Sequence, residues 1–106
     1  IRYINQNLSA PLTLEGLART FYMSKNHLTA VFKRATGTTV ARYILYKRMA
    51  IVRKELAMGV PAAEAASRAG FGDYSSFFRA YKKMFGCAPS DKNAPGMPEM
   101  DKGSTV

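Results

Sequence analysis

Two segments of the chain repeat one pattern of residues, and this repeat constrains the fold more than any other feature. The matching pairs lie first 48 and then 49 positions apart: Ala18 with Ala66, Met23 with Phe71, Leu28 with Phe77, Phe32 with Tyr81, Lys33 with Lys82, Arg34 with Lys83 and Gly37 with Gly86. The change of offset adds one residue to the turn of the second copy. A short helix with a small residue, a tight turn and a second amphipathic helix make up a helix-turn-helix. The repeat therefore predicts two such units, at about residues 13–37 and 61–86.

The remaining sequence also favours helices. Proline is absent from residues 12–60, and β-branched residues never alternate with polar ones for long, so strands are not expected. Residues 39–58 are predicted to form one long helix, with an apolar stripe at Leu45, Met49, Val52 and Leu56. We therefore predict an all-α fold in which this linker helix joins the two units.

The expected helix ends carry residues with known capping preferences. Residues 1–8 are predicted to be the end of a first helix, and the helix before the first turn should run to about Phe21. The capping residues are N-cap side chains at Thr13, Ser24 and either Asp73 or Ser75, a proline suited to the first helical position at Pro61, and C-terminal glycines at Gly37, Gly59 and Gly86.

With 106 residues, the chain has room for one domain with its own core. We place this domain at residues 1–92 and expect a flexible tail at residues 93–106, where asparagine, proline and glycine break any helix. The start at Ile1, without a methionine, indicates a piece of a longer product. No stretch approaches the length of apolar sequence that spans a membrane, so we expect no membrane partner.

Several chemical functions find no support in the residues. Cys87 and His27 each stand alone, so neither a disulfide nor a zinc cluster is expected, and His27 is interpreted as structural beside Leu28. Phosphate-binding glycine loops, paired carboxylates and nucleophile–base arrangements are also missing. We predict that the protein is not an enzyme, needs no cofactor and works in a reducing cytosol.

The positive charge is concentrated in long stretches. The net charge is +9, and no acidic residue interrupts the basic residues between Glu15 and Glu55 or between Asp73 and Asp91. Such stretches are typical of a surface that binds nucleic acid, but they also occur on faces that are simply solvated. The alternative function is a helical protein-interaction or adaptor module whose basic face binds an acidic partner.

Three stretches resemble the C-terminal DNA-binding domain of AraC/XylS-family transcription regulators. They are "LARTFYMSKNHLTAVFKRATG" at residues 17–37, "YILYKRM" at residues 43–49 and "GFGDYSSFFRAYKKMFGCAP" at residues 70–89. The resemblance covers about residues 1–90. It implies about seven helices, double-stranded DNA as partner, RNA polymerase as a further partner, an effector or dimerisation domain upstream, and a nucleoid-associated protein of the bacterial cytoplasm.

The chain departs from the family pattern at three places. Ala30 stands where the family often has an arginine, which removes a reader of guanine. Tyr22 stands where the first turn usually has glycine, so a positive φ there would be strained. Asp91, Lys92 and Asn93 replace the family's closing aromatic and basic residues.

The resemblance and the repeat together predict the DNA-binding residues. The expected base contacts are Asn26, Thr29, Ala30, Tyr74, Ser75, Ser76 and Arg79. The expected contacts to the DNA backbone are Ser24, Lys25, Lys33, Arg34, Phe78, Lys82 and Lys83. Arg79 can bind guanine O6 and N7 together, whereas its alternative role is an ion pair with Asp73. The long linker helix leads us to expect the two recognition helices in successive major grooves.

Overall fold

The chain folds into helices throughout the residues that the structure, a computed structural model, describes: 2–10, 12–90 and 97. The helices are α1 (Arg2–Gln6), α2 (Leu14–Thr20), α3 (Lys25–Thr36), α4 (Val40–Ala57), α5 (Ala62–Arg68) and α6 (Tyr74–Phe85). No strand occurs in this part of the chain, which confirms the all-α prediction. The predicted flexible tail lies outside the described residues, apart from residue 97.

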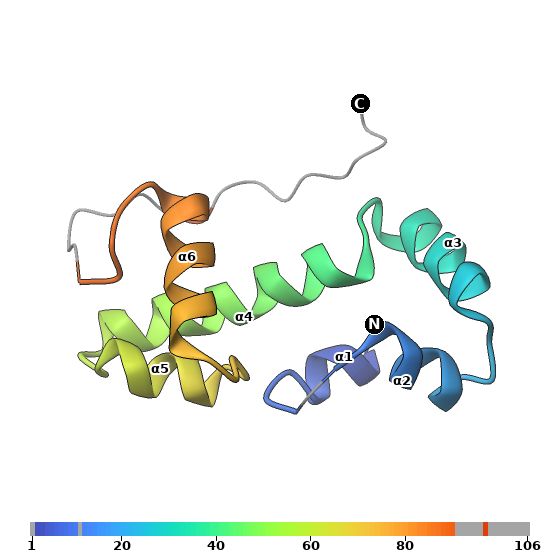
Figure 1. The fold of residues 1–106 in the computed structure, drawn as a ribbon, viewed down its shortest axis with the longest axis horizontal. Helices are drawn as coiled ribbons and strands as arrows, with labels where there is room; N and C mark the ends of the chain where they lie inside the picture. The colour runs from blue at the N-terminus through green and yellow to red at the C-terminus, as the bar shows by residue number, and fades with distance from the viewer. Residues whose placement is uncertain (1, 11, 91–96, 98–106) are drawn as a thin grey trace.

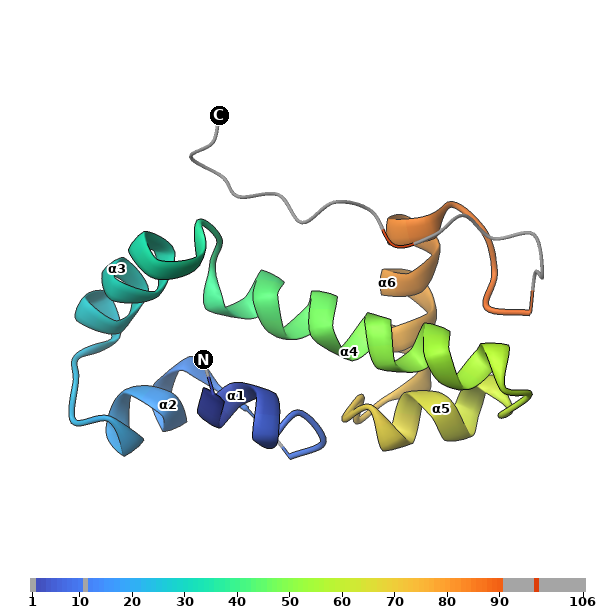
Figure 2. The same ribbon diagram turned by 180° about the vertical axis from the view of Figure 1, so that it is seen from behind.

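Helix α4 forms the spine of the molecule. Helices α1, α2 and α3 gather around its N-terminal end, and α5 and α6 pack against its C-terminal half (Figure 1). The view from behind shows the same division into two helix groups at the two ends of α4 (Figure 2). Each group corresponds to one of the two predicted helix-turn-helix units.

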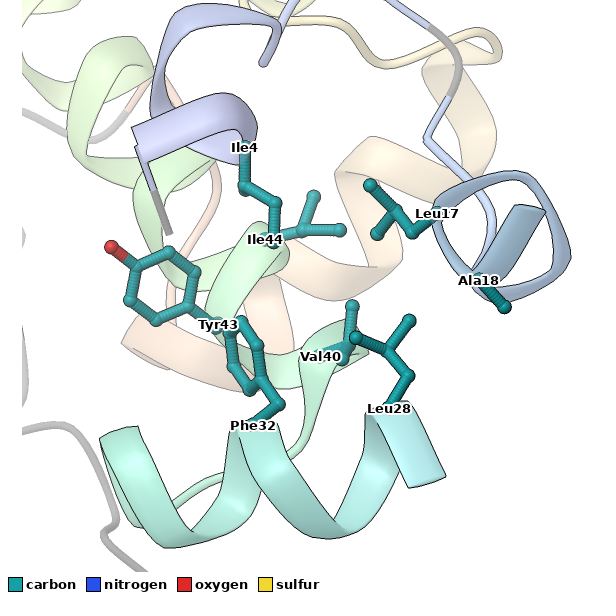
Figure 3. Packing of buried hydrophobic residues seen from close by; sticks show 8 residues of the cluster. All are labelled: Ile4, Leu17, Ala18, Leu28, Phe32, Val40, Tyr43 and Ile44. Atoms are coloured by element: carbon teal, nitrogen blue, oxygen red, sulfur yellow. The ribbon is translucent and has the colours of Figure 1, made fainter. Parts of the chain in front are cut away.

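The first unit encloses its own hydrophobic core. Buried side chains from α1 to α4 converge there: Ile4, Leu17, Ala18, Leu28, Phe32, Val40, Tyr43 and Ile44 (Figure 3). The rings of Phe32 and Tyr43 meet edge to face, with their centroids 5.3 Å apart. This arrangement is favourable for aromatic pairs and attaches α3 to α4.

The second unit has a separate core on the C-terminal half of α4. Its buried members are Met49, Val52, Ala65, Ala66, Ala69, Phe77, Tyr81 and Phe85. The predicted stripe of Leu45, Met49, Val52 and Leu56 faces this core. Helix α4 also buries Val40, Tyr43 and Ile44 in the first core, which the apolar stripe did not predict, so the helix serves the two units with different residues.

The repeat is visible in the backbone of both turns. In the first, the amides of Tyr22 and Met23 donate to the carbonyls of Arg19 and Ala18, at 3.3 and 2.9 Å. In the second, the amides of Gly70 and Phe71 donate to Ser67 and Ala66, at 3.1 and 3.0 Å. This pair of bonds defines the Schellman motif, which places its central residue in the left-handed region. Tyr22 has φ +57° and Gly70 φ +103°, so the turn places Tyr22 in the positive-φ region that is strained for a residue with a side chain.

The observed helix ends lie close to the predicted ones. Thr13, Ser24 and Asp73 accept the N-capping hydrogen bonds, and Gly37 and Gly86 end α3 and α6 with φ of 81° and 76°. Two boundaries differ: α1 ends at Gln6 rather than near residue 8, and Pro61 is the N-cap of α5 rather than its first residue. Fraying at the first turn and last turn commonly moves boundaries by this amount.

Candidate nucleic-acid interface

Helix α3 presents most of its predicted DNA-binding residues to solvent. Leu28 and Phe32 are buried against the first core, which turns the opposite face of the helix outward. The exposed residues are Ser24, Lys25, Asn26, Thr29, Ala30, Lys33 and Arg34. Ser24 also caps the helix, because its hydroxyl accepts a hydrogen bond of 3.0 Å from the amide of His27.

Helix α6 repeats this arrangement at the other end of α4. Phe77, Tyr81 and Phe85 are buried, as predicted for the anchors of the helix. The exposed predicted residues are Tyr74, Ser75, Ser76, Arg79, Lys82 and Lys83. Phe78 is half-buried, and its ring lies 6.2 Å from that of Tyr74. Both helices therefore carry polar residues near the start and two adjacent cations in the last turn.

The start of α6 is held by a hydrogen-bonded cap. One carboxylate oxygen of Asp73 accepts from the amide of Ser76 at 3.0 Å and from its hydroxyl at 2.7 Å. The hydrogen bond from the Ser76 side chain, followed by that from its amide, lowers the pKa of Asp73 below its ordinary value. Ser76 thus has a structural role besides the predicted base contact.

Arg79 keeps its guanidinium on the exposed side of α6. Its nearest hydrogen-bond partner is the Ser76 hydroxyl, at 3.5 Å, which is a weak interaction. Among the described residues Arg79 forms no ion pair with Asp73, so the alternative role considered for it is not what the structure contains.

Part of the basic stretch is used inside the protein rather than on its surface. Arg48 is half-buried and binds two backbone carbonyls, and the guanidinium of Arg53 stacks on the Phe85 ring at 4.4 Å. Lys25 forms an exposed ion pair with Glu15, at 3.7 Å between Nζ and Oε2. Pairs of this kind contribute little to stability, so Lys25 can exchange its partner.

Histidine, cysteine and acidic residues are spread over the described part of the structure rather than clustered. In that part of the chain, no group of three or more histidine, cysteine or acidic residues could hold a metal ion. His27 is exposed on α3, next to the buried Leu28. Cys87 is a half-buried free thiol.

Comparisons with known proteins agree with this geometry. A family model described as a helix-turn-helix domain matches residues 17–93. The chain is 32% identical over 88 residues to the multiple antibiotic resistance protein MarA of Escherichia coli, covering 82% of this chain and 69% of MarA. The chain belongs to the AraC/XylS family.

Two further similarities show how much of a family member the chain represents. It is 28% identical over 89 residues to the probable transcriptional regulator LumQ of Photobacterium leiognathi, covering 83% of this chain but 36% of LumQ. It therefore spans about a third of that relative. Among solved structures, the C-terminal domain of AraT, a response regulator from Geobacillus stearothermophilus, superposes with a TM-score of 0.77 at 29% identity, covering 83% of this chain and 74% of that one.

Family membership bears on the broad functional class. The AraC/XylS family consists of DNA-binding transcription regulators, which are not an enzyme class. None of the described helices is long and apolar enough to cross a membrane. The departures of this AraC/XylS member at Tyr22 and Ala30 both concern exposed residues, at the turn and on the outward face of α3.

Proposed function

We propose that this AraC/XylS domain binds double-stranded DNA sequence-specifically, with α3 and α6 in two successive major grooves. The observation that carries the proposal is the pair of exposed, equivalent helix faces at the two ends of one continuous helix. A helix-turn-helix inserts the outward face of its second helix into the major groove. Here both second helices offer such a face.

The length of α4 supports simultaneous binding by a single molecule. Eighteen residues at 1.5 Å each make α4 about 27 Å long, and α3 lies beyond its N-terminal end (Figures 1 and 2). Major-groove segments on one face of DNA are roughly 34 Å apart, about 10 base pairs. One copy of the domain would then read two half-sites of different sequence, because α3 and α6 differ in most of their outward residues.

The exposed side chains divide into two proposed roles. Base edges would be contacted by Asn26, Thr29, Ala30, Tyr74, Ser75, Ser76 and Arg79. The DNA backbone would be contacted by Ser24, Lys25, Lys33, Arg34, Phe78, Lys82 and Lys83. The methyl side chain of Ala30 has no hydrogen-bond donor or acceptor, so its contribution would be apolar contact with a thymine methyl group.

The test begins by selecting bound sites from a random duplex pool. The selected site should contain two dissimilar half-sites about 10 base pairs apart. Inserting about five base pairs between them turns one half-site to the opposite face of the duplex, so affinity should fall to that of a single half-site. If affinity and footprint survive the insertion, or if the site is a palindrome occupied by two copies, the proposal of one two-headed molecule is wrong.

The salt dependence of binding separates this proposal from an adaptor function. With six to ten phosphate contacts, affinity should fall by about a thousandfold or more between 50 and 200 mM salt, because neutralised phosphates release their counterions. Undetectable binding to any duplex at low salt would instead favour the adaptor module with an acidic protein partner.

The proposal extends to the whole regulator. We infer an effector or dimerisation domain on the N-terminal side, since this chain spans about a third of LumQ. RNA polymerase is a proposed second partner, and the bacterial cytoplasm, in association with the nucleoid, is the proposed location. Pull-down of polymerase by the DNA-bound full-length protein tests the second partner.

A further inference from the structure

A half-buried arginine joins the linker helix to the loop between α1 and α2. Arg48, near the middle of α4, donates from Nε to the carbonyl oxygen of Leu8 at 2.9 Å and from Nη2 to that of Ala10 at 2.8 Å. Burial lowers the pKa of its guanidinium, which still remains charged at neutral pH. The planar fork of an arginine can hold two carbonyls at once, which an ammonium group does not reproduce.

The turn of the second unit packs on the same carbonyl group. A methyl group added at Gly70 would overlap the carbonyl oxygen of Leu8 and come within 2.9 Å of Arg48 Nε. Gly70 also has φ +103°, a backbone conformation that residues with a side chain rarely adopt. Three segments that are distant in sequence therefore meet at one point: the α1–α2 loop, α4 and the α5–α6 turn.

This meeting point, which we call the junction, consists of Leu8, Ala10, Arg48 and Gly70. Its two sides are attached to different cores, because Leu8 packs against the first core and Phe71, the neighbour of Gly70, packs against the second. Among the described helices, extensive packing occurs within each unit and between each unit and α4, but not directly between the two units. The junction and the stiffness of α4 thus carry the geometry that relates α3 to α6.

We propose that Arg48 is a positioning residue, which fixes the orientation of α6 relative to α3 and thereby sets the half-site spacing that the domain accepts. This inference rests on the proposed binding of two half-sites. Its structural part, the fixed orientation, holds for the free protein and can be tested without DNA. Arg48 directs its guanidinium at two backbone carbonyls and is not among the proposed DNA-binding residues.

The first experiment measures the orientation in the free protein. Spin labels at Ala35→Cys and Ala63→Cys, both exposed and outside the proposed DNA-binding residues, report the distance between the units in a Cys87→Ala background. The otherwise unchanged protein should give one narrow distance distribution, measured by pulsed electron paramagnetic resonance. Arg48→Lys should broaden it at least twofold, whereas the control Lys54→Arg, at an exposed residue of the same helix, should leave it unchanged.

The second experiment measures spacing preference on DNA. Each added or removed base pair rotates one half-site by about a tenth of a turn, so a fixed domain should discriminate against it. We expect a preference of about tenfold for the selected spacing in the unchanged protein, and about threefold or less in Arg48→Lys. Affinity for a single half-site should stay within about twofold, since Lys keeps the charge and the reading surfaces are intact.

These outcomes distinguish a failure of the positioning role of Arg48 from a failure of the proposed DNA binding. If Arg48→Lys broadens the distance distribution but the protein binds no DNA, the positioning role is supported and the DNA-binding proposal is wrong. If folded Arg48→Lys has an unchanged distance distribution and an unchanged spacing preference, the positioning role of Arg48 is wrong, while the DNA-binding proposal is unaffected. Gly70→Ala perturbs the same point from the second unit and should also broaden the distances. If both variants lose cooperative unfolding, the junction supports the fold of each unit rather than their orientation, and the inference is wrong.

Discussion

Replacing Tyr22 with glycine should stabilise the domain, because Tyr22 has an unfavourable backbone conformation and almost no compensating contacts. Its φ is +57° and 96% of its surface is exposed. The left-handed conformation costs an L-residue about 1–2 kcal/mol. Glycine avoids that cost but loses about 0.5–1 kcal/mol through the greater freedom of the unfolded chain. Since loss of the exposed ring removes little buried area, the net gain should be about 0.5–1 kcal/mol.

Urea unfolding followed by circular dichroism measures this gain as a higher midpoint at an unchanged slope. The melting temperature should rise by about 2–8 °C, given the size of the domain. Tyr22→Ala is the matched control: it removes the same ring but keeps a Cβ, so its stability should stay near that of the unchanged protein. A Tyr22→Gly protein no more stable than Tyr22→Ala would refute the assignment of strain to this turn.

Four other substitutions test the second unit. Gly70→Ala should destabilise the fold by about 2–4 kcal/mol in urea unfolding, combining the left-handed penalty with overlap at the Leu8 carbonyl; a neutral effect would show that the turn can relax. Asp73→Asn retains an N-cap but removes the titrating group. Because the pKa of Asp73 is lower in the folded state, its ionised carboxylate stabilises the fold above the ordinary pKa of 3.8. This stabilisation is lost as the pH falls through the pKa of the folded state. The free energy of unfolding should therefore decline less below pH 4 in Asp73→Asn, and equal declines would contradict the cap assignment. On the selected DNA site, Arg79→Ala should cost roughly 1–3 kcal/mol and relax the choice of one base pair, while Lys82→Ala should weaken specific and random duplexes alike, as competition gel shifts will measure. An equal loss on both duplexes for Arg79→Ala would remove its base-reading role.

The site could be predicted from the sequence to the extent that it depends on helix faces. Burial of Phe77 and Tyr81 in α6 determines that Arg79 and Lys82 point outward, and the spacing of these residues is visible in the sequence. His27 shows why each helix position has to be placed separately, since it directly precedes the buried Leu28 and is itself exposed. Adjacent positions on a helix lie about 100° apart, so neighbourhood in sequence does not imply a shared face.

Features that depend on residues close together in the chain could be predicted from the sequence alone. The side chains of Thr13, Ser24 and Asp73 accept hydrogen bonds from the amides three residues later, and the glycines after the helices adopt the positive φ that these helix ends require. The repeat adds the two-unit plan, because each copy carries its own turn and its own core residues. Such interactions are encoded within a few positions of each other, and patterns of residue type are enough to find them.

Contacts between segments that are far apart in the sequence become visible only in the tertiary structure. The division of α4 between two cores depends on where each helix group docks, and apolar spacing along one helix does not say which partner it will meet. Arg48 looked like one more surface cation, yet it binds carbonyls about 40 positions earlier in the chain. A backbone carbonyl exists at every residue, so no pattern of side chains marks the one that an arginine will reach. That choice is made when the two units pack on α4 and the Leu8 carbonyl comes to lie between Arg48 and Gly70.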